Sequence, residues 1–240
     1  MLKVDMHIHS IASGHCVSTI NEIINYAKSK KMTHIGITEH GPDMEGAPHQ
    51  GYFLISNNIP KNFGKLKVYF GCEANIIGLN GELDLKKEYL ESQDIIIVGL
   101  HEKTTYPQNL SKKSNTKSIV NAIKSGYASV ISHPIRPEFQ VNIQDLIHAA
   151  VESDVIIELN TQLMRSIVNT NYMKDYEELV KVAKDNGAKI IINSDAHAHY
   201  FVGDDFILKK LKNTLGISKI DLLNFNPRKL EKILELHRNV

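Results

Sequence analysis

Seven short apolar, β-branched segments recur at nearly regular intervals along the chain. They span residues 2–8, 33–38, 66–72, 94–100, 128–132, 154–159 and 188–193, so successive segments start 26 to 34 residues apart. This interval is the length of one step in which two parallel strands are joined by a helix. The spacing therefore predicts seven parallel strands with helices between them.

The intervening stretches carry helix signals. Helices are predicted over residues 19–30, 118–125, 172–186 and about 226–237. The first begins with a capping box, Thr19 with Glu22, and the second and third end just before a glycine. The fourth begins with Asn226-Pro227, and residues 41–60 are expected to form a long loop with a weak helix signal.

Alternating strands and helices fit either a closed barrel or an open doubly wound sheet. The central segments are almost wholly apolar, as expected for strands covered by helices, and this holds for both folds. We favour a distorted (β/α)7 barrel because ligand-type residues follow six different segments, whereas an open sheet gathers only those near its switch point. A length of 240 residues suits one domain of this kind over 1–240.

Composition narrows the function classes. The formal net charge is only +1 and no dense Lys/Arg stripe is present, so nucleic acid is not the expected partner. No apolar run approaches the roughly 18 residues of a membrane helix, and a cytoplasmic protein is expected. Cys16 and Cys72 cannot form a disulfide framework and are interpreted as small, partly buried residues. The oligomeric state is not predicted.

Nine residues of metal-ligand type stand at or near the ends of these segments: His7, His9, His15, His40, Glu73, His101, His133, Asp195 and His197. All except His15 lie at or just past the end of an apolar segment. The ends of parallel barrel strands meet on one rim, so these side chains should converge on one pocket.

Two of the strand ends carry paired ligand types at i, i+2, which places both side chains on one face. They are His7 with His9, and Asp195 with His197. Alternation along the first strand is expected to send Asp5 into the barrel mouth together with the two histidines. The apolar residues Leu2, Val4, Met6 and Ile8 would then face the helices.

The number of these residues exceeds the needs of one ion, because zinc takes three or four protein ligands. Glu73 alone would be interpreted as half of an ion pair, but beside several imidazoles it is better explained as a carboxylate shared between metals. Imidazole-rich sites favour zinc, iron or manganese over magnesium or calcium. Of the other histidines, His34, His148 and His237 are expected to be structural, whereas His49 and His199 could contact substrate.

Several motifs together resemble those of the PHP (polymerase and histidinol phosphatase) family, and in particular its YcdX-like phosphatase branch. They are Asp5-Met6-His7-Ile8-His9, Thr38-Glu39-His40-Gly41, Gly71-Cys72-Glu73-Ala74-Asn75, His101, Ser132-His133-Pro134 and Ser194-Asp195-Ala196-His197. The resemblance covers essentially the whole chain. Glu39 stands where the family often has Asp, and Ile135-Arg136 follow His133-Pro134 where a smaller Gly-Asn is expected.

The resemblance implies a distorted (β/α)7 barrel with three metal ions, usually zinc. One ion would be held by His7, His9, Glu73 and Asp195, a second by Glu73, His101 and His133, and a third by His15, His40 and His197. The implied activity is hydrolysis of a small phosphomonoester by a metal-activated water. The general acid is not identified: a metal-bound water, His49 or His199 could protonate the leaving group. Arg136, Arg165 and Lys103 are candidate phosphate contacts.

Three other functions stay open at this point. An amidohydrolase-type enzyme also begins with His-x-His, but it commonly uses a lysine on strand four, where this chain has His101 with Lys103 beyond it. A phosphodiesterase or nuclease would use the same metals but is disfavoured by the missing basic stripe. A non-catalytic metal-binding protein would not need ligands in this excess.

Overall fold

The computed structural model of the protein describes residues 1–211, 215–218 and 222–238. Its strands are β1 (Val4–Ile8), β2 (His34–His40), β3 (Asn62–Phe63), β4 (Leu66–Asn75), β5 (Ile95–Gly99), β6 (Val130–Ile131), β7 (Ile156–Asn160) and β8 (Lys189–Asn193). Its α-helices are α1 (Ile20–Ser29), α2 (Lys87–Leu90), α3 (Lys112–Lys124), α4 (Ile143–Glu152), α5 (Thr161–Ile167), α6 (Tyr172–Asp185), α7 (Phe206–Leu211) and α8 (Pro227–Arg238). Short 3-10 helices are η1 (Ile11–Ser13), η2 (Gln50–Asn58), η3 (His199–Phe201) and η5 (Leu223–Phe225).

Seven parallel strands form one nearly closed barrel, in the order β1-β2-β4-β5-β6-β7-β8. The short β3 pairs antiparallel with the N-terminal end of β4. At the rim, β1 meets β8 through a parallel bridge between Ile8 and Ala196. The predicted seven-stranded barrel is therefore confirmed.

The lower part of the seam between β1 and β8 is filled by the segment around η5. Leu222 forms a parallel bridge with Ile190, and the side chain of Asn224 reaches both edge strands. Its amide donates to the carbonyls of Val4 (2.9 Å) and Ile192 (2.7 Å) and accepts from the Ile192 N–H (2.8 Å). One buried side chain thus supplies hydrogen bonds that a neighbouring strand would otherwise make.

The first strand departs from the predicted simple alternation. Its pairing with β2 shifts register between Asp5 and Ile8, as in a β-bulge, which puts an extra residue on one strand. Val4 and Met6 consequently pack in one buried cluster with the inner residues of the barrel and with α8. Asp5 accepts hydrogen bonds from Ser194 and Gly203, so the expectation that it enters the mouth with the histidines was wrong.

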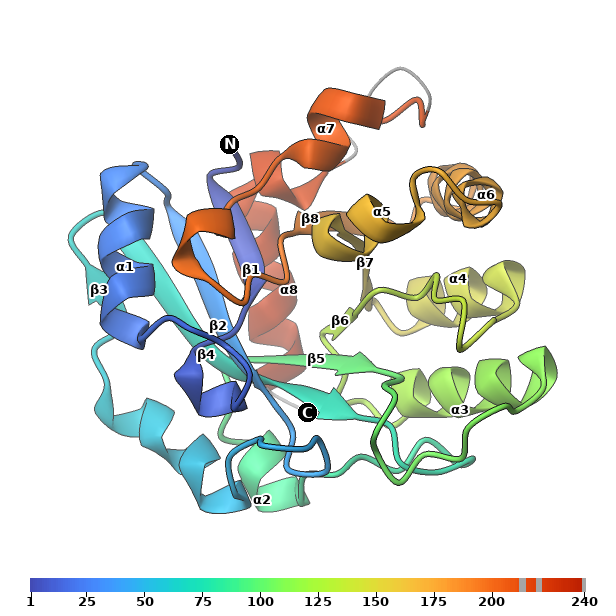
Figure 1. Ribbon diagram of the computed structural model, residues 1–240, viewed down its shortest axis with the longest axis horizontal. Helices are drawn as coiled ribbons and strands as arrows, with labels where there is room; N and C mark the ends of the chain where they lie inside the picture. Colours follow the sequence, from blue (N-terminus) through green and yellow to red (C-terminus); the bar gives the residue numbers. More distant parts are fainter. Residues whose placement is uncertain (212–214, 219–221, 239–240) are drawn as a thin grey trace.

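The bottom of the barrel is closed by α8. Its apolar face, Leu230, Ile233 and Leu234, packs against inward side chains of the strands, and Figure 1 shows α8 between β1 and β5. A separate buried cluster joins α1 to the outer faces of β1, β2 and β4. The interior of the barrel below the rim is therefore a packed core.

The predicted helices are present, with shifted bounds. The predicted helix at 118–125 is the second half of α3, which begins earlier because Ser111 caps it by accepting from the N–H of Ser114. The expected loop at 41–60 contains η2 as its only described helix. The sequence interpretation missed α4, which Asn142 caps. Among the described residues, no helix is both long and apolar enough to span a membrane.

The loop after β2 is fixed by a partly buried carboxylate. Asp84 accepts from the N–H of Asn75 (2.9 Å), from the N–H of Asp43 (3.0 Å) and from the Asn75 amide. A Cβ on Gly41 would lie 2.2 Å from an Asp84 oxygen, so only glycine fits there. Burial raises the pKa of Asp84 to about 6, because these hydrogen bonds only partly offset the desolvation of its charge.

Candidate metal centre

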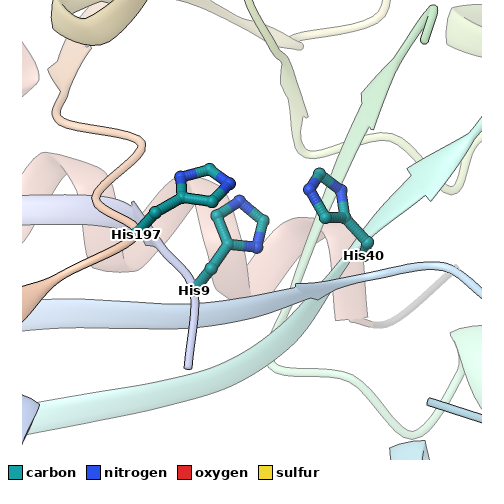
Figure 2. A group of neighbouring side chains, drawn as sticks. All are labelled: His9, His40 and His197. Atoms are coloured by element: carbon teal, nitrogen blue, oxygen red, sulfur yellow. The ribbon is translucent and has the colours of Figure 1, made fainter. Parts of the chain in front are cut away.

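Eight of the nine predicted ligands lie at or just past the carboxyl ends of the strands, and His15 lies in the loop after η1, beside His197. Seven of them are buried, whereas His15 is exposed and His197 is partly buried. Figure 2 shows three of the rings, His9 after β1, His40 at the end of β2 and His197 after β8, turned toward one another. Residues almost 190 positions apart in the chain therefore share one pocket.

Glu73 stands at the centre of this cluster and is fully buried. Its Oε2 lies 3.2 Å from His7 Nε2, 3.4 Å from His9 Nε2 and 2.9 Å from His40 Nδ1. Its Oε1 lies 3.1 Å from His101 Nε2 and 3.0 Å from His133 Nε2. Imidazoles thus surround both oxygens of one carboxylate, the arrangement needed for a carboxylate shared by two cations.

The residues expected around the first two ions are brought together. Ligand atoms of His7, His9 and Asp195 lie within 4.8 Å of one another, with Glu73 beside them. His101 Nε2 and His133 Nε2 are 3.2 Å apart and both face the Glu73 carboxylate. These two sets have the composition that the family resemblance implies, and their role as metal ligands stays a prediction.

The third set is only partly assembled as expected. His15 Nε2 lies 3.0 Å from His197 Nε2, but their third close neighbour is the thiol of Cys16. His40 is grouped with His9 and His197, and also with Glu73 and His101. The sequence interpretation gave Cys16 no role at the site: although it adjoins the candidate ligand His15, it was interpreted as a small, partly buried residue.

The ring tautomers explain why His7 and His9 fit a cation. His7 Nδ1 donates to the Glu158 carboxylate at 2.7 Å, and His9 Nδ1 donates to Ser13 Oγ at 3.1 Å, since that hydroxyl itself donates to Glu39. Both Nε2 atoms of the neutral rings therefore carry lone pairs, and they face each other at 3.0 Å. If both rings were protonated on Nε2, two N–H groups would face each other instead and would also repel. A cation between the two nitrogens relieves either repulsion, so the donor set fits a metal.

Electrostatics inside the cluster divide the histidines into two groups. Burial opposes a charge on His7 and His9, but the nearby carboxylates outweigh it, raising the pKa of His9 to about 9 and that of His7 well above its usual range. Burial lowers the pKa of His101 and His197, and together with repulsion by His9 it lowers that of His40 to about 3. The second group is neutral at physiological pH, which is the form that binds metal.

The carboxylates at the site remain ionised despite burial. Desolvation opposes their charge, but the surrounding imidazoles hold the pKa of Glu73 well below its usual range and also lower that of Asp195. Within the described residues, Glu73 Oε2 and Asp195 Oδ1 are buried oxygens with no hydrogen-bond donor. Buried oxygens of this kind are costly unless a cation occupies the space between them.

Two of the candidate ligands adopt backbone conformations that are rare for residues other than glycine. His133 has a φ of 25° and Asp195 a φ of 54°. The N–H of His133 donates to Glu158, and the N–H of Asp195 donates to the carbonyl of His7. Backbone strain held in place by hydrogen bonds is characteristic of functional sites.

The sequence interpretation missed a layer of polar residues that holds the ligands. Glu158, Asn160 and Asn193 are fully buried beneath the cluster and bind one another and the ligands. A signal was present, because Glu158 and Asn160 interrupt an apolar strand at i, i+2. Glu39 and Ser13 form a second such pair on the other side of His9.

The residues named as candidate general acids occupy different surroundings. His49 is exposed, and its Nδ1 accepts from the N–H of Gly51 at 3.1 Å, so the ring proton of the neutral form is on Nε2. His199 lies against Tyr26 and Tyr200, with Nδ1 2.9 Å from Ser18 Oγ. Either role in proton transfer stays a prediction.

Of the candidate phosphate contacts, Arg136 lies beside the cluster and its charge contributes to lowering the pKa of His101. It is paired with Glu102 at 3.6 Å and Glu138 at 3.4 Å. Arg165 is bound to Asp204 and stacks on Phe206, which occupies its guanidinium. Lys103 lies in the turn after β5, with a φ of 60°.

Comparison with known proteins gives a consistent picture. The PHP domain family matches residues 5–237 of the chain. A probable phosphatase from Clostridium novyi (strain NT) is 30% identical over 227 residues, which cover 95% of this chain and 92% of that protein.

Solved structures share the fold at low sequence identity. Histidinol phosphate phosphatase from Lactococcus lactis subsp. lactis Il1403, crystallised with zinc, L-histidinol and phosphate, gives a TM-score of 0.61 at 17% identity over 96% of this chain and 93% of that one. A chain of archaeal ribonuclease P, solved by cryo-EM with mature tRNA, gives a TM-score of 0.62 at 17% identity over 98% of this chain and 91% of that one. At this identity the likeness concerns the fold alone.

Proposed function

Because the chain belongs to the PHP domain family, we propose that it is a metal-dependent phosphatase that hydrolyses small phosphomonoesters at a trinuclear, zinc-containing site. Membership of the YcdX-like phosphatase branch is also part of this proposal, and it rests on the sequence motifs. The family match spans residues 5–237, and a relative that is 30% identical is a probable phosphatase. Because a chain of archaeal ribonuclease P shares the fold, the chemistry of the site, and not the fold, is the deciding evidence.

One observation carries the proposal. The buried carboxylate of Glu73 has imidazole nitrogens within 3.4 Å on both of its oxygens, from His7, His9 and His40 on one side and from His101 and His133 on the other. A carboxylate in this position is shared by two cations. Paired metals about 3.5–4 Å apart are suited to phosphoryl transfer, where both the attacking and the leaving oxygen need charge stabilisation.

In this proposal His7, His9, Glu73 and Asp195 hold one ion, Glu73, His101 and His133 a second, and His15, His40 and His197 the third. Zinc suits this imidazole-rich set, and manganese or iron are alternatives. When bound, the ions would neutralise phosphate oxygens and lower the pKa of a water molecule from about 15.7 to about 7.

The chain's own groups would orient the substrate and move the proton. His49 carries its ring proton on Nε2, the atom that would protonate the leaving alkoxide, while His199 is the second candidate acid. Arg136 would bind a substrate oxygen from the β6 side of the rim, since its two ion pairs are long enough to be exchanged for a phosphate contact.

The first prediction concerns the reaction class. Metal-replete protein should hydrolyse histidinol phosphate or p-nitrophenyl phosphate much faster than a phosphodiester or an amide, measured as kcat/KM with zinc, manganese and iron in turn. Absence of monoester turnover with every metal would contradict the proposal. Faster diester turnover would favour the phosphodiesterase alternative, and faster amide turnover the amidohydrolase alternative.

A pair of variants separates the site from the rest of the molecule. Glu73→Ala should lower kcat/KM by at least about 10²-fold, the loss typical of removing one group that stabilises the transition state. His34→Ala is the control, because His34 lies at the other end of the barrel, where it contacts Glu231. Equal activity in the two variants would rule out the shared role of Glu73.

A further inference from the structure

A fully buried carboxylate on β7 contacts the cluster of predicted ligands from below without being one of them. Glu158, on β7, has no exposed surface. Its Oε1 accepts from His7 Nδ1 at 2.7 Å and from Asn193 Nδ2 at 2.9 Å. Its Oε2 accepts from the N–H of His133 at 2.9 Å and from Asn160 Nδ2 at 3.0 Å. All four donors converge on one side chain.

These contacts tie together ligands that come from different strands. The bond to His7 Nδ1 keeps the His7 proton on Nδ1, so that Nε2 faces the pocket as a lone pair. The bond to the His133 N–H holds that residue in its rare backbone conformation, with a φ of 25°. Asn160, which also donates to Asp195 Oδ2 at 3.2 Å, extends the same network to a third ligand.

We propose that Glu158 is a positioning residue that sets the spacing between the first and second metal positions by holding His7 and His133 through one carboxylate. The proposal rests on the proposed metal centre, and it assigns to β7 a part in the site that the predicted ligands do not give it. Each oxygen of Glu158 already accepts from two donors, which leaves neither of them free to bind a metal ion.

Glutamine cannot replace glutamate in this position. An ionised carboxylate accepts hydrogen bonds on both oxygens, whereas the glutamine side chain has one accepting oxygen and one donating NH₂ group. Whichever way the amide turns, its NH₂ faces two other donors: either those of His7 and Asn193 or those of His133 and Asn160. Glu158→Gln therefore releases one of the two ligands while changing the volume very little.

The test measures metal binding without substrate. Zn²⁺ affinity of the protein is determined by competition with a chromophoric chelator, for wild type and for Glu158→Gln. At least one zinc equivalent should bind about 10- to 100-fold more weakly in the variant, the loss usual when a carboxylate behind a ligating histidine is removed. Full stoichiometry at wild-type affinity would overturn the proposal.

Glu231→Gln is the matched control. Glu231 also accepts from a histidine ring, His34 Nε2 at 3.2 Å, but at the opposite end of the barrel, and it additionally pairs with Lys67. It should keep wild-type zinc affinity. The rise in Tm caused by zinc should shrink in Glu158→Gln and be unchanged in Glu231→Gln, because the stabilisation by a ligand increases with the logarithm of its concentration divided by its Kd. A merely structural role would lower the Tm of both zinc-free and zinc-loaded Glu158→Gln equally.

A measurement on the wild-type protein covers the case in which Glu158→Gln does not fold. In zinc-loaded protein with isotope-labelled histidine, NMR should find the His7 proton on Nδ1, protected from exchange by the bond to Glu158. A proton on Nε2 instead would overturn the proposal. Wild type that binds zinc in this manner but hydrolyses no phosphomonoester would refute the proposed function and leave the role of Glu158 intact.

Discussion

Ser13 shows how much one small residue can organise. Its hydroxyl donates to Glu39 Oε2 at 2.6 Å and accepts from His9 Nδ1 and from the N–H of His40, each at 3.1 Å. Glu39 also accepts from the N–H of Ser10 at 3.0 Å. Glu39, the departure from the family's usual Asp, thus acts on His9 and on the backbone of His40 through a serine.

Ser13→Ala should therefore weaken metal binding. The substitution leaves the Nδ1 proton of His9 without its acceptor and frees the ring to turn, and we expect about a 10-fold loss of zinc affinity, the lower end of the range for a group behind a ligand. Chelator competition gives the measurement. Ser29→Ala, whose hydroxyl donates to the Tyr26 carbonyl at the end of α1, should have no effect. A Ser13→Ala protein with unchanged affinity would contradict the role of the serine.

The residues around the cluster were recoverable from sequence to different degrees. Histidines and acids at strand ends stand out, because parallel strands place their ends on one rim whatever the loops do. Glu158 and Ser13 do not stand out, since their role depends on which atoms they face. Cys16 is interpreted from the sequence as a small, partly buried residue, whereas the structure places its thiol beside His15 and His197.

Among the elements, the loop after β2 depends on a carboxylate from a distant turn. Asp84 is partly buried and accepts from N–H donors of Asn75 and Asp43. Its pKa is raised from 3.8 to about 6. A raised folded-state pKa means that folding takes up a proton between these two values.

The stability of this arrangement should consequently depend on pH. The contribution of Asp84 is fully present below the unfolded pKa and is lost as pH rises through about 6. Between pH 7 and pH 5, the free energy of unfolding of wild type relative to Asp84→Asn should rise by about 1 kcal/mol. Denaturant titrations with a chelator in both samples would measure this difference. A difference that stays constant or falls toward pH 5 would refute the assignment.

Element positions were predictable, but the faces of β1 were not. The segment spacing located every strand of the barrel, because a strand and its helix need a nearly fixed number of residues. The bulge between Asp5 and Ile8 has no sequence signature of its own, and it reversed the expected direction of Val4 and Met6. The sequence analysis did not predict the helix α4 over residues 143–152, although Asn142 in front of it is a suitable N-cap.

At the scale of the whole molecule, the closed ring depends on Asn224. Its amide satisfies backbone groups of Val4 and Ile192 on the two edge strands, all of them buried. Asn224→Ala should lower the free energy of unfolding by at least about 2 kcal/mol, because each buried backbone group left unpaired costs about 1–3 kcal/mol. Thermal or urea unfolding measures the loss.

Asn80→Ala provides the comparison, since Asn80 bonds to Glu82 in an exposed turn and should change stability very little. Equal effects of the two substitutions would show that the seam does not need the Asn224 amide. The number of strands in the ring was predictable from the sequence, but this seam was not, because a single asparagine near a helix start suggests only a cap.

The closure by Asn224 also constrains the order of events during synthesis. Val4 leaves the ribosome early, but the side chain that completes its hydrogen bonding is 220 residues away, and the apolar face of α8 follows later still. A nascent chain can form its strand and helix pairs one after another, yet it keeps an open sheet edge until α8 has emerged. Until then the facing edges of β1 and β8 stay exposed to pairing with other chains, so this barrel should depend on chaperones most strongly between the synthesis of β8 and that of α8.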